Sequence, residues 1–221
     1  MFYFFSYLLI MPKYTKKEIY SILFQKIANG GYKDGKRLKE KEIAEYFNVS
    51  RTPIRVVLQQ LAQDGLIQIH PNRGAIVRSL TPDDIEEIYE IRKNLEILAL
   101  EYAVNIINLG ELNKIQNKII NLQKKPDVAG AIKCDDELHL FIYQSSGKFR
   151  IINILNQLMR ITERFRDMGF RDKAILDRVN IEHLELIDAL VERDFHKGKT
   201  ILAQHLDNSK IATLRFIFTN N

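Results

Sequence analysis

The chain has 221 residues, of which 46% are hydrophobic and 28% charged, enough for one or two soluble domains with proper cores. Cys134 is the only cysteine, which excludes an intramolecular disulfide and a zinc site built from several thiolates. No stretch reaches the roughly 20 apolar residues that span a bilayer. We therefore expect a cytoplasmic protein that does not insert into a membrane.

Charge is unevenly distributed along the chain. Residues 11–80 carry a net charge of +7, whereas residues 81–221 carry −2. A basic module joined to a near-neutral one is typical of a DNA-binding domain linked to a domain without that role, although chance could also produce the asymmetry.

The first ten residues, MFYFFSYLLI, are apolar and aromatic and carry no charge. They lack the basic region and the small-residue cleavage site of a signal peptide. We expect residues 1–10 to be a non-native or disordered extension and Met11 to be the natural start.

Residues 11–80 have the pattern of a winged helix-turn-helix domain. Apolar spacing predicts a helix near 19–27, a second near 40–47, and a third from the N-cap residue Ser50 to about Asp64, ended by Gly65. Two β-rich runs, 66–70 and 75–79, flank a turn with glycine and predict a hairpin.

Residues 81–221 are predicted to form an all-helical second domain, so the fold class is mainly α. Thr81 is a suitable N-cap for the first helix of this domain. The expected helices span 82–108, 111–124, 128–145, 148–168, 172–193 and 195–218.

The third helix carries a polar stripe opposite its apolar face. Arg51, Arg55 and Gln59 are spaced by four residues, and Thr52 lies beside them. Such a helix fits the major groove of DNA, where arginine can bind guanine O6 and N7 with two hydrogen bonds. An ordinary solvated helix face is the alternative.

The second domain contains four residues that are suitable for binding a metal ion. Asp135 and His139 are four residues apart on one helix, and His183 and His205 lie on two later helices. Three imidazoles and a carboxylate suit zinc first and also nickel or manganese. Taken singly, a helical histidine is more often a surface or core residue than a ligand.

The segment EKEIAEYFNVSRTPIRVVLQQLAQDGLIQIHPNRGAIV closely resembles the DNA-binding domain of the GntR regulators. The resemblance implies that Arg51, Thr52 and Arg55 contact the operator. It also implies phosphate contacts for Ser50 and Lys41 and a minor-groove approach by Gly74, next to the basic residue Arg73.

The segments DDELHLFIYQSSG, NIEHLELIDALVERD and ILAQHL resemble the FCD ligand-binding domain of GntR regulators, in its shorter form. The resemblance implies an antiparallel helical bundle with a divalent metal on Asp135, His139, His183 and His205. A small carboxylate or hydroxy acid would bind beside the metal, with Arg92 helping to hold it. A surface pair between Arg92 and Glu96 is the alternative for that arginine.

Together these features predict a transcription regulator, in the commoner arrangement a repressor, that binds a pseudo-palindromic operator as a homodimer. We do not expect an enzyme. A metal-dependent hydrolase and an architectural DNA-binding protein that senses no ligand are the alternatives.

Overall fold

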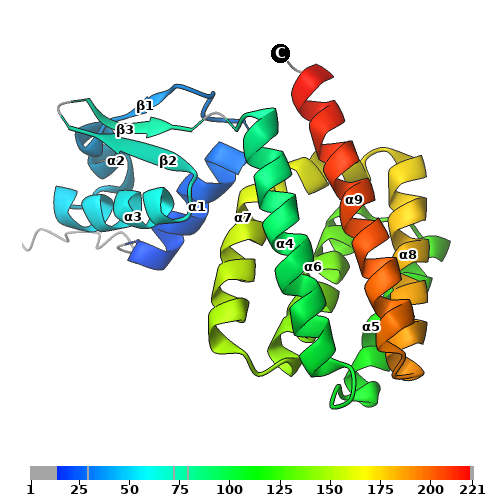
Figure 1. Ribbon diagram of the computed structural model, residues 1–221. Coiled ribbons are helices and arrows are strands. Elements are labelled where there is room, and N and C mark those ends of the chain that lie inside the picture. The colour runs from blue at the N-terminus through cyan, green and yellow to red at the C-terminus, as the bar shows by residue number, and fades with distance from the viewer. Residues whose placement is uncertain (1–13, 29, 72, 79, 220–221) are drawn as a thin grey trace, which may run out of the picture. The chain divides into compact units, whose positions relative to one another are not determined.

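The computed structural model describes residues 14–28, 30–71, 73–78 and 80–219, and these are mainly helical (Figure 1). The predicted extension at residues 1–10 and the predicted start at Met11 lie outside the described residues. The chain divides into two compact units, one up to residue 79 and one from residue 80.

The first unit is a winged helix-turn-helix. Its elements are α1 (Lys16–Ala28), β1 (Arg37–Leu38), α2 (Glu40–Phe47), α3 (Arg51–Gln63), β2 (Ile67–His70) and β3 (Gly74–Val77). The strands form an antiparallel sheet in the order β1-β3-β2, with Ala75 paired to both Leu38 and Ile69. Sequence reasoning missed β1 because two residues are too few to show an alternating pattern.

Helix α3 is held in the first unit by its apolar face. Ile54, Val57, Leu58 and Leu61 are each at most 3% exposed and belong to one core with residues of α1, α2 and the sheet. Gly65 follows α3 with a φ of 74°, a left-handed conformation that favours glycine, and ends the helix as the sequence predicted.

Ser50 occupies the N-cap position of α3, as the sequence predicted, and has extended backbone angles. Its side chain makes no capping hydrogen bond, so the hydroxyl does not contribute to holding the first turn of the helix.

The second unit is a bundle of long helices (Figure 1). Its helices are α4 (Pro82–Ala103), α5 (Leu109–Lys124), α6 (Val128–Ser145), α7 (Phe149–Phe170), α8 (Lys173–Val191) and α9 (Phe195–Thr219). Figure 1 shows α4 and α9 side by side and running in opposite directions, and α9 also packs on α8. In the described part of the chain, no helix is long and apolar enough to cross a membrane.

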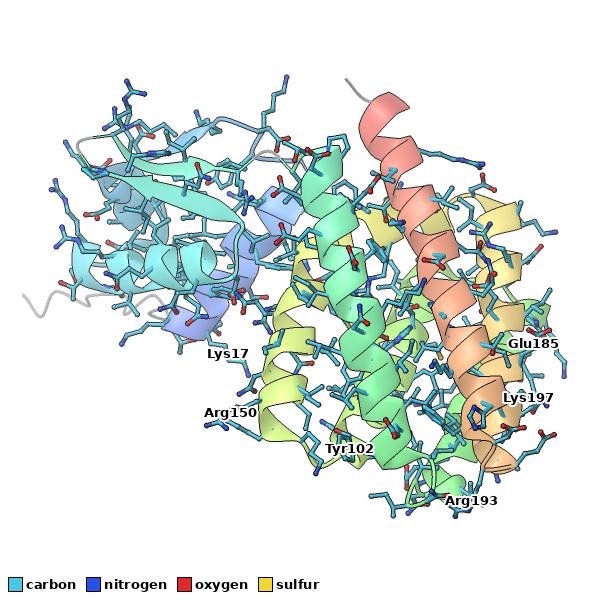
Figure 2. The ribbon with its side chains drawn as sticks, viewed as in Figure 1. Lys17, Tyr102, Arg150, Glu185, Arg193 and Lys197 are labelled. Carbon is cyan, nitrogen blue, oxygen red and sulfur yellow. The ribbon has the colours of Figure 1, made fainter. Side chains whose placement is uncertain are left out.

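Side-chain hydrogen bonds cap the starts of α4 and α5 and hold the turn into α9. The side chain of Asn108 accepts hydrogen bonds from the backbone N–H groups of Gly110 and Glu111, so α5 starts there. Helix α4 ends at Ala103, before the predicted residue 108. Thr81 caps α4 as predicted, in a reciprocal pair of hydrogen bonds with Asp84. At the turn into α9, the Arg193 guanidinium donates to the Val104 carbonyl at 3.0 Å (Figure 2).

The interior of the bundle is mainly apolar. Large side chains such as Leu112, Leu138 and Leu186 are fully buried. Among them lies a group of buried polar side chains: Arg92, Glu96, Asp135, His139, Glu182, His183 and His205. Burying such groups is costly unless they are paired or bind an ion, so their partners decide what this region does.

Candidate functional site

The structure places the predicted DNA-reading residues on the free face of α3. Arg51, Thr52, Arg55 and Gln59 are all exposed, while the opposite face forms the core. The unused Ser50 hydroxyl is exposed at the start of the same helix. Donors at a helix N-terminus favour anions such as phosphate, because the helix dipole is positive there.

The remaining predicted DNA contacts come from α2 and the hairpin. Lys41 is exposed on α2, with its amino group 3.8 Å from a Glu45 carboxylate oxygen. Arg73 and Gly74 are exposed in the hairpin, and Gly74 has a φ of 76°, which favours glycine. The side chain of Arg37, which sequence reasoning did not single out, lies next to Gly74.

The four predicted metal ligands meet inside the bundle. Helix α6 supplies Asp135 and His139, α8 supplies His183, and α9 supplies His205. One donor atom from each lies within 4.8 Å of the others, and all four residues are at most 4% exposed. The tertiary structure thus brings together residues up to 70 positions apart in sequence.

The donor atoms fit a bound cation. Nε2 of His139 lies 3.3 Å from Nε2 of His205, and Nε2 of His183 lies 3.4 Å from Oδ1 of Asp135. Donors about 2.1 Å from one ion are about 3 to 3.5 Å apart when they are neighbours around it. The buried Nε2 of His183 also has no hydrogen-bond partner among the described residues.

Glutamates fix the orientation of two of these histidines. Oε2 of Glu96 lies 2.9 Å from Nδ1 of His139, and Oε2 of Glu182 lies 2.8 Å from Nδ1 of His205. Each carboxylate favours the tautomer with the proton on Nδ1 and leaves the Nε2 lone pair directed into the site. Two lone pairs facing each other at 3.3 Å repel unless a proton or a metal ion lies between them.

Asp135 is held in a similar way by a residue from α7. Its Oδ2 atom accepts a hydrogen bond from Nη1 of Arg166, which also bonds Asp136. Its Oδ1 atom remains directed at His139 and His183. Sequence reasoning missed Arg166, Glu96 and Glu182 as partners of the ligands, because their distance in space is set by helix packing.

Electrostatics favour a carboxylate at Asp135 and a neutral imidazole at His183. Burial opposes ionisation of Asp135, but Arg166 and the neighbouring histidines outweigh it and hold the pKa of this carboxyl well below its usual range. Burial, reinforced by His205, lowers the pKa of His183 well below its usual value, so this imidazole is neutral. A carboxylate and neutral imidazoles are the species that coordinate divalent metals.

Arg92 pairs with Glu96, but inside the bundle. Nε of Arg92 donates to Oε1 of Glu96 at 2.9 Å, and the two side chains are 3% and 0% exposed. The alternative of a surface pair is therefore wrong. Burial opposes ionisation of Glu96, yet Arg92 and His139 lower its pKa to about 2, so the pair is ionised. Through Glu96, Arg92 is linked to the ligand His139.

Comparison with known proteins identifies both units. Residues 15–77 match the model of the bacterial regulatory proteins of the gntR family, and residues 87–208 match the FCD domain. The chain belongs to the GntR family. Both expectations from the sequence, a winged helix-turn-helix followed by an FCD-type bundle, are confirmed.

Named relatives and solved structures agree with this assignment. The HTH-type transcriptional repressor RspR of Escherichia coli K12 is 27% identical over 87% of this chain and 86% of its own length. The gluconate operon transcriptional repressor of Bacillus licheniformis is 33% identical over 84% of this chain and 79% of its own. E. coli McbR/YncC, at 23% identity, shares the fold with a TM-score of 0.73 over 93% of this chain and 97% of its own.

This GntR-family protein is thus a transcriptional regulator with a DNA-binding GntR domain and an FCD domain. Its relatives are regulators, and regulators of this family are generally not enzymes, which argues against the hydrolase alternative. The buried histidines and aspartate form a possible metal site within the FCD domain.

Proposed function

We propose that this protein is a cytoplasmic repressor that binds a pseudo-palindromic operator as a homodimer. A small carboxylate or hydroxy acid, bound beside a divalent metal in the bundle, controls its affinity for DNA. The main support for ligand sensing is the group of four buried residues that could bind a metal ion, two of them histidines oriented by glutamates. An architectural DNA-binding protein would have no use for this costly arrangement.

The DNA-reading half rests on the exposed face of α3. Arg51 and Arg55 project from one stripe that is free of core contacts, with Thr52 beside them. Ser50, Lys41, Arg73 and Gly74 are exposed in the same unit and suit phosphate or groove contacts. Repression is favoured because two of the relatives are named as repressors.

Replacing the arginines tests base reading. Arg51→Ala or Arg55→Ala should each reduce affinity for the operator by about 1–3 kcal/mol, if each grips a guanine with two hydrogen bonds. Lys41→Ala should instead weaken binding to all duplexes and reduce the salt dependence, as expected for a phosphate contact. Fluorescence anisotropy at several salt concentrations measures both effects. Unchanged operator affinity in both arginine variants would disprove the assignment of α3.

The metal site would be formed by Asp135, His139, His183 and His205. Zinc suits this donor set first, and nickel or manganese can occupy the same residues. When bound, the metal would supply a Lewis-acidic position for a carboxylate or hydroxyl oxygen of the effector. Glu96, Glu182 and Arg166 would keep the ligands pointed at it.

The charge of the site, once a metal is bound, supports an acidic effector. The buried carboxylates Glu96, Asp135 and Glu182 outnumber Arg92 and Arg166 around the donor group, so the two positive charges of a bound divalent ion would be what makes the site attract an acid. Arg92 already donates a hydrogen bond to Glu96, so an effector that contacts Arg92 would share its guanidinium with that carboxylate. One relative represses the gluconate operon, and gluconate is itself a hydroxy acid.

Removing two ligands tests the metal site. The double variant His183→Ala/His205→Ala should lose its bound metal and the rise in melting temperature that zinc, nickel or manganese gives the wild type. Citrate and gluconate, added as test acids, should raise the melting temperature of the metal-loaded wild type only. His196→Ala is the matched control, because His196 is exposed on α9 away from the donor group. Equal metal content of wild type and double variant would exclude these ligands.

Homodimerisation is proposed because one short reading helix recognises only a half-site. The bundle has exposed apolar side chains on α4 and α7, where Tyr102 is 45% and Phe149 74% exposed. Figure 2 shows Tyr102 and Arg150 at the same end of the bundle, where α4 ends and α7 begins. Phe149, the more exposed of the two, is the side chain that we propose contacts a second copy.

A charge on this surface should disrupt the dimer. Phe149→Glu should shift the protein towards monomer at micromolar concentration, because the dimer would have to bury the carboxylate. A glutamate suits the first turn of α7, so the fold should remain intact. Ile181→Glu is the control, since Ile181 is 52% exposed on α8. Sedimentation velocity measures the change, and a wild type that is monomeric and binds a single half-site would contradict the proposal.

A further inference from the structure

The guanidinium of Arg55 on α3 is held by an acid from another helix. Its Nε donates to Oε1 of Glu40 at 3.0 Å, and its Nη2 donates to Oε2 of Glu40 at 2.9 Å. Glu40 is the first residue of α2, 15 positions before Arg55. The two parallel hydrogen bonds fix the plane of the guanidinium as well as its position.

This contact leaves one edge of the guanidinium available. A guanidinium has five N–H groups, and Glu40 takes one on Nε and one on Nη2. The three others, on Nη1 and Nη2, have no acceptor among the described residues, and the Arg55 side chain is 64% exposed. Two of these N–H groups form the parallel pair that matches O6 and N7 of guanine.

The other acids of α2 are paired differently. Glu42 bonds Lys39, and Glu45 lies near Lys41, so both have partners within four residues on their own helix or its cap. Glu40 is the acid of α2 that pairs with α3 in the described part of the chain. An exposed ion pair adds little to stability, and a carboxylate beside a DNA-reading face repels phosphate. An acid in the first turn of α2 interacts favourably with the helix dipole, but Glu42 does the same without contacting α3, so none of these effects explains the contact between Glu40 and Arg55.

We propose that Glu40 is a positioning residue for base recognition, which holds Arg55 so that its free N–H pair grips a guanine. It would set sequence specificity without contacting DNA itself. Arg55 has four rotatable side-chain bonds, and fixing them before binding reduces the entropy lost on the operator. At a wrong base, the fixed guanidinium could not rotate to reach another acceptor, so binding to that sequence would be weaker. This inference rests on the proposed role of Arg55 as a base-reading residue.

The experiment compares specific with non-specific binding by the full chain. The specific probe is the duplex that the wild type enriches most from a random-sequence pool, and the non-specific probe is the same duplex scrambled. Glu40→Ala should lower the ratio of the two affinities by about 5- to 100-fold, the value of one guanine contact. Binding to the scrambled duplex should not weaken, because a negative charge has been removed.

Glu42→Ala is the matched control. It removes the same charge from the same helix but leaves the contact with Arg55 intact. It should change both affinities by a similar factor and keep their ratio. If Glu40→Ala behaves like Glu42→Ala, the carboxylate acts only through its charge and the proposal is wrong.

Arg55→Ala separates this inference from the assignment on which it rests. If Arg55→Ala lowers the ratio and Glu40→Ala does not, Arg55 reads DNA but needs no support from Glu40. If Arg55→Ala leaves the ratio unchanged, both the reading role and the positioning role are wrong. In the double variant, Glu40→Ala should add nothing to the loss caused by Arg55→Ala, because the two residues act as one unit.

Discussion

The structure of the second unit depends on four donor atoms held within 4.8 Å of one another in the interior of a helical bundle. Buried imidazoles and carboxylates are stable only where partners compensate for the water they have lost. Helices α4, α7 and α8 supply these partners, so the position of each helix is tied to the same point. An ion or effector at that point would act on the packing of the whole bundle.

Both units use a carboxylate to orient a nitrogen donor. Glu96 and Glu182 orient imidazoles inside the bundle, and Glu40 orients a guanidinium on the surface of the DNA-binding unit. The acid contacts the side of the ring or guanidinium that faces away from the site, and the opposite side stays free for a ligand. Donors fixed in this way lose less conformational entropy when they bind. The same physical arrangement thus underlies the proposed metal site and the proposed base-reading side chain.

Most of the helices could be predicted because their signals are local. The apolar spacing along α2, α3 and α6 reproduces their bounds within about a residue, and Thr81 and Gly65 act as the predicted cap and terminator. The first helix of the bundle was predicted to end at 108 but ends at Ala103, where a turn begins, and the next helix starts two residues earlier than predicted, after its cap Asn108. Strand β1 was missed because its two residues exist as a strand only through pairing with β3.

The sequence by itself determined which residues could bind metal, since Asp135 and His139 share a helix face and the family resemblance supplies His183 and His205. It also determined the polar stripe on α3, because spacing by four residues places side chains on one face of any helix. Only the tertiary structure decided that Arg92 is buried and that Glu96, Glu182, Arg166 and Glu40 act as partners. Their partners are between 15 and 43 residues away along the chain, and no local pattern encodes a distance that helix packing creates.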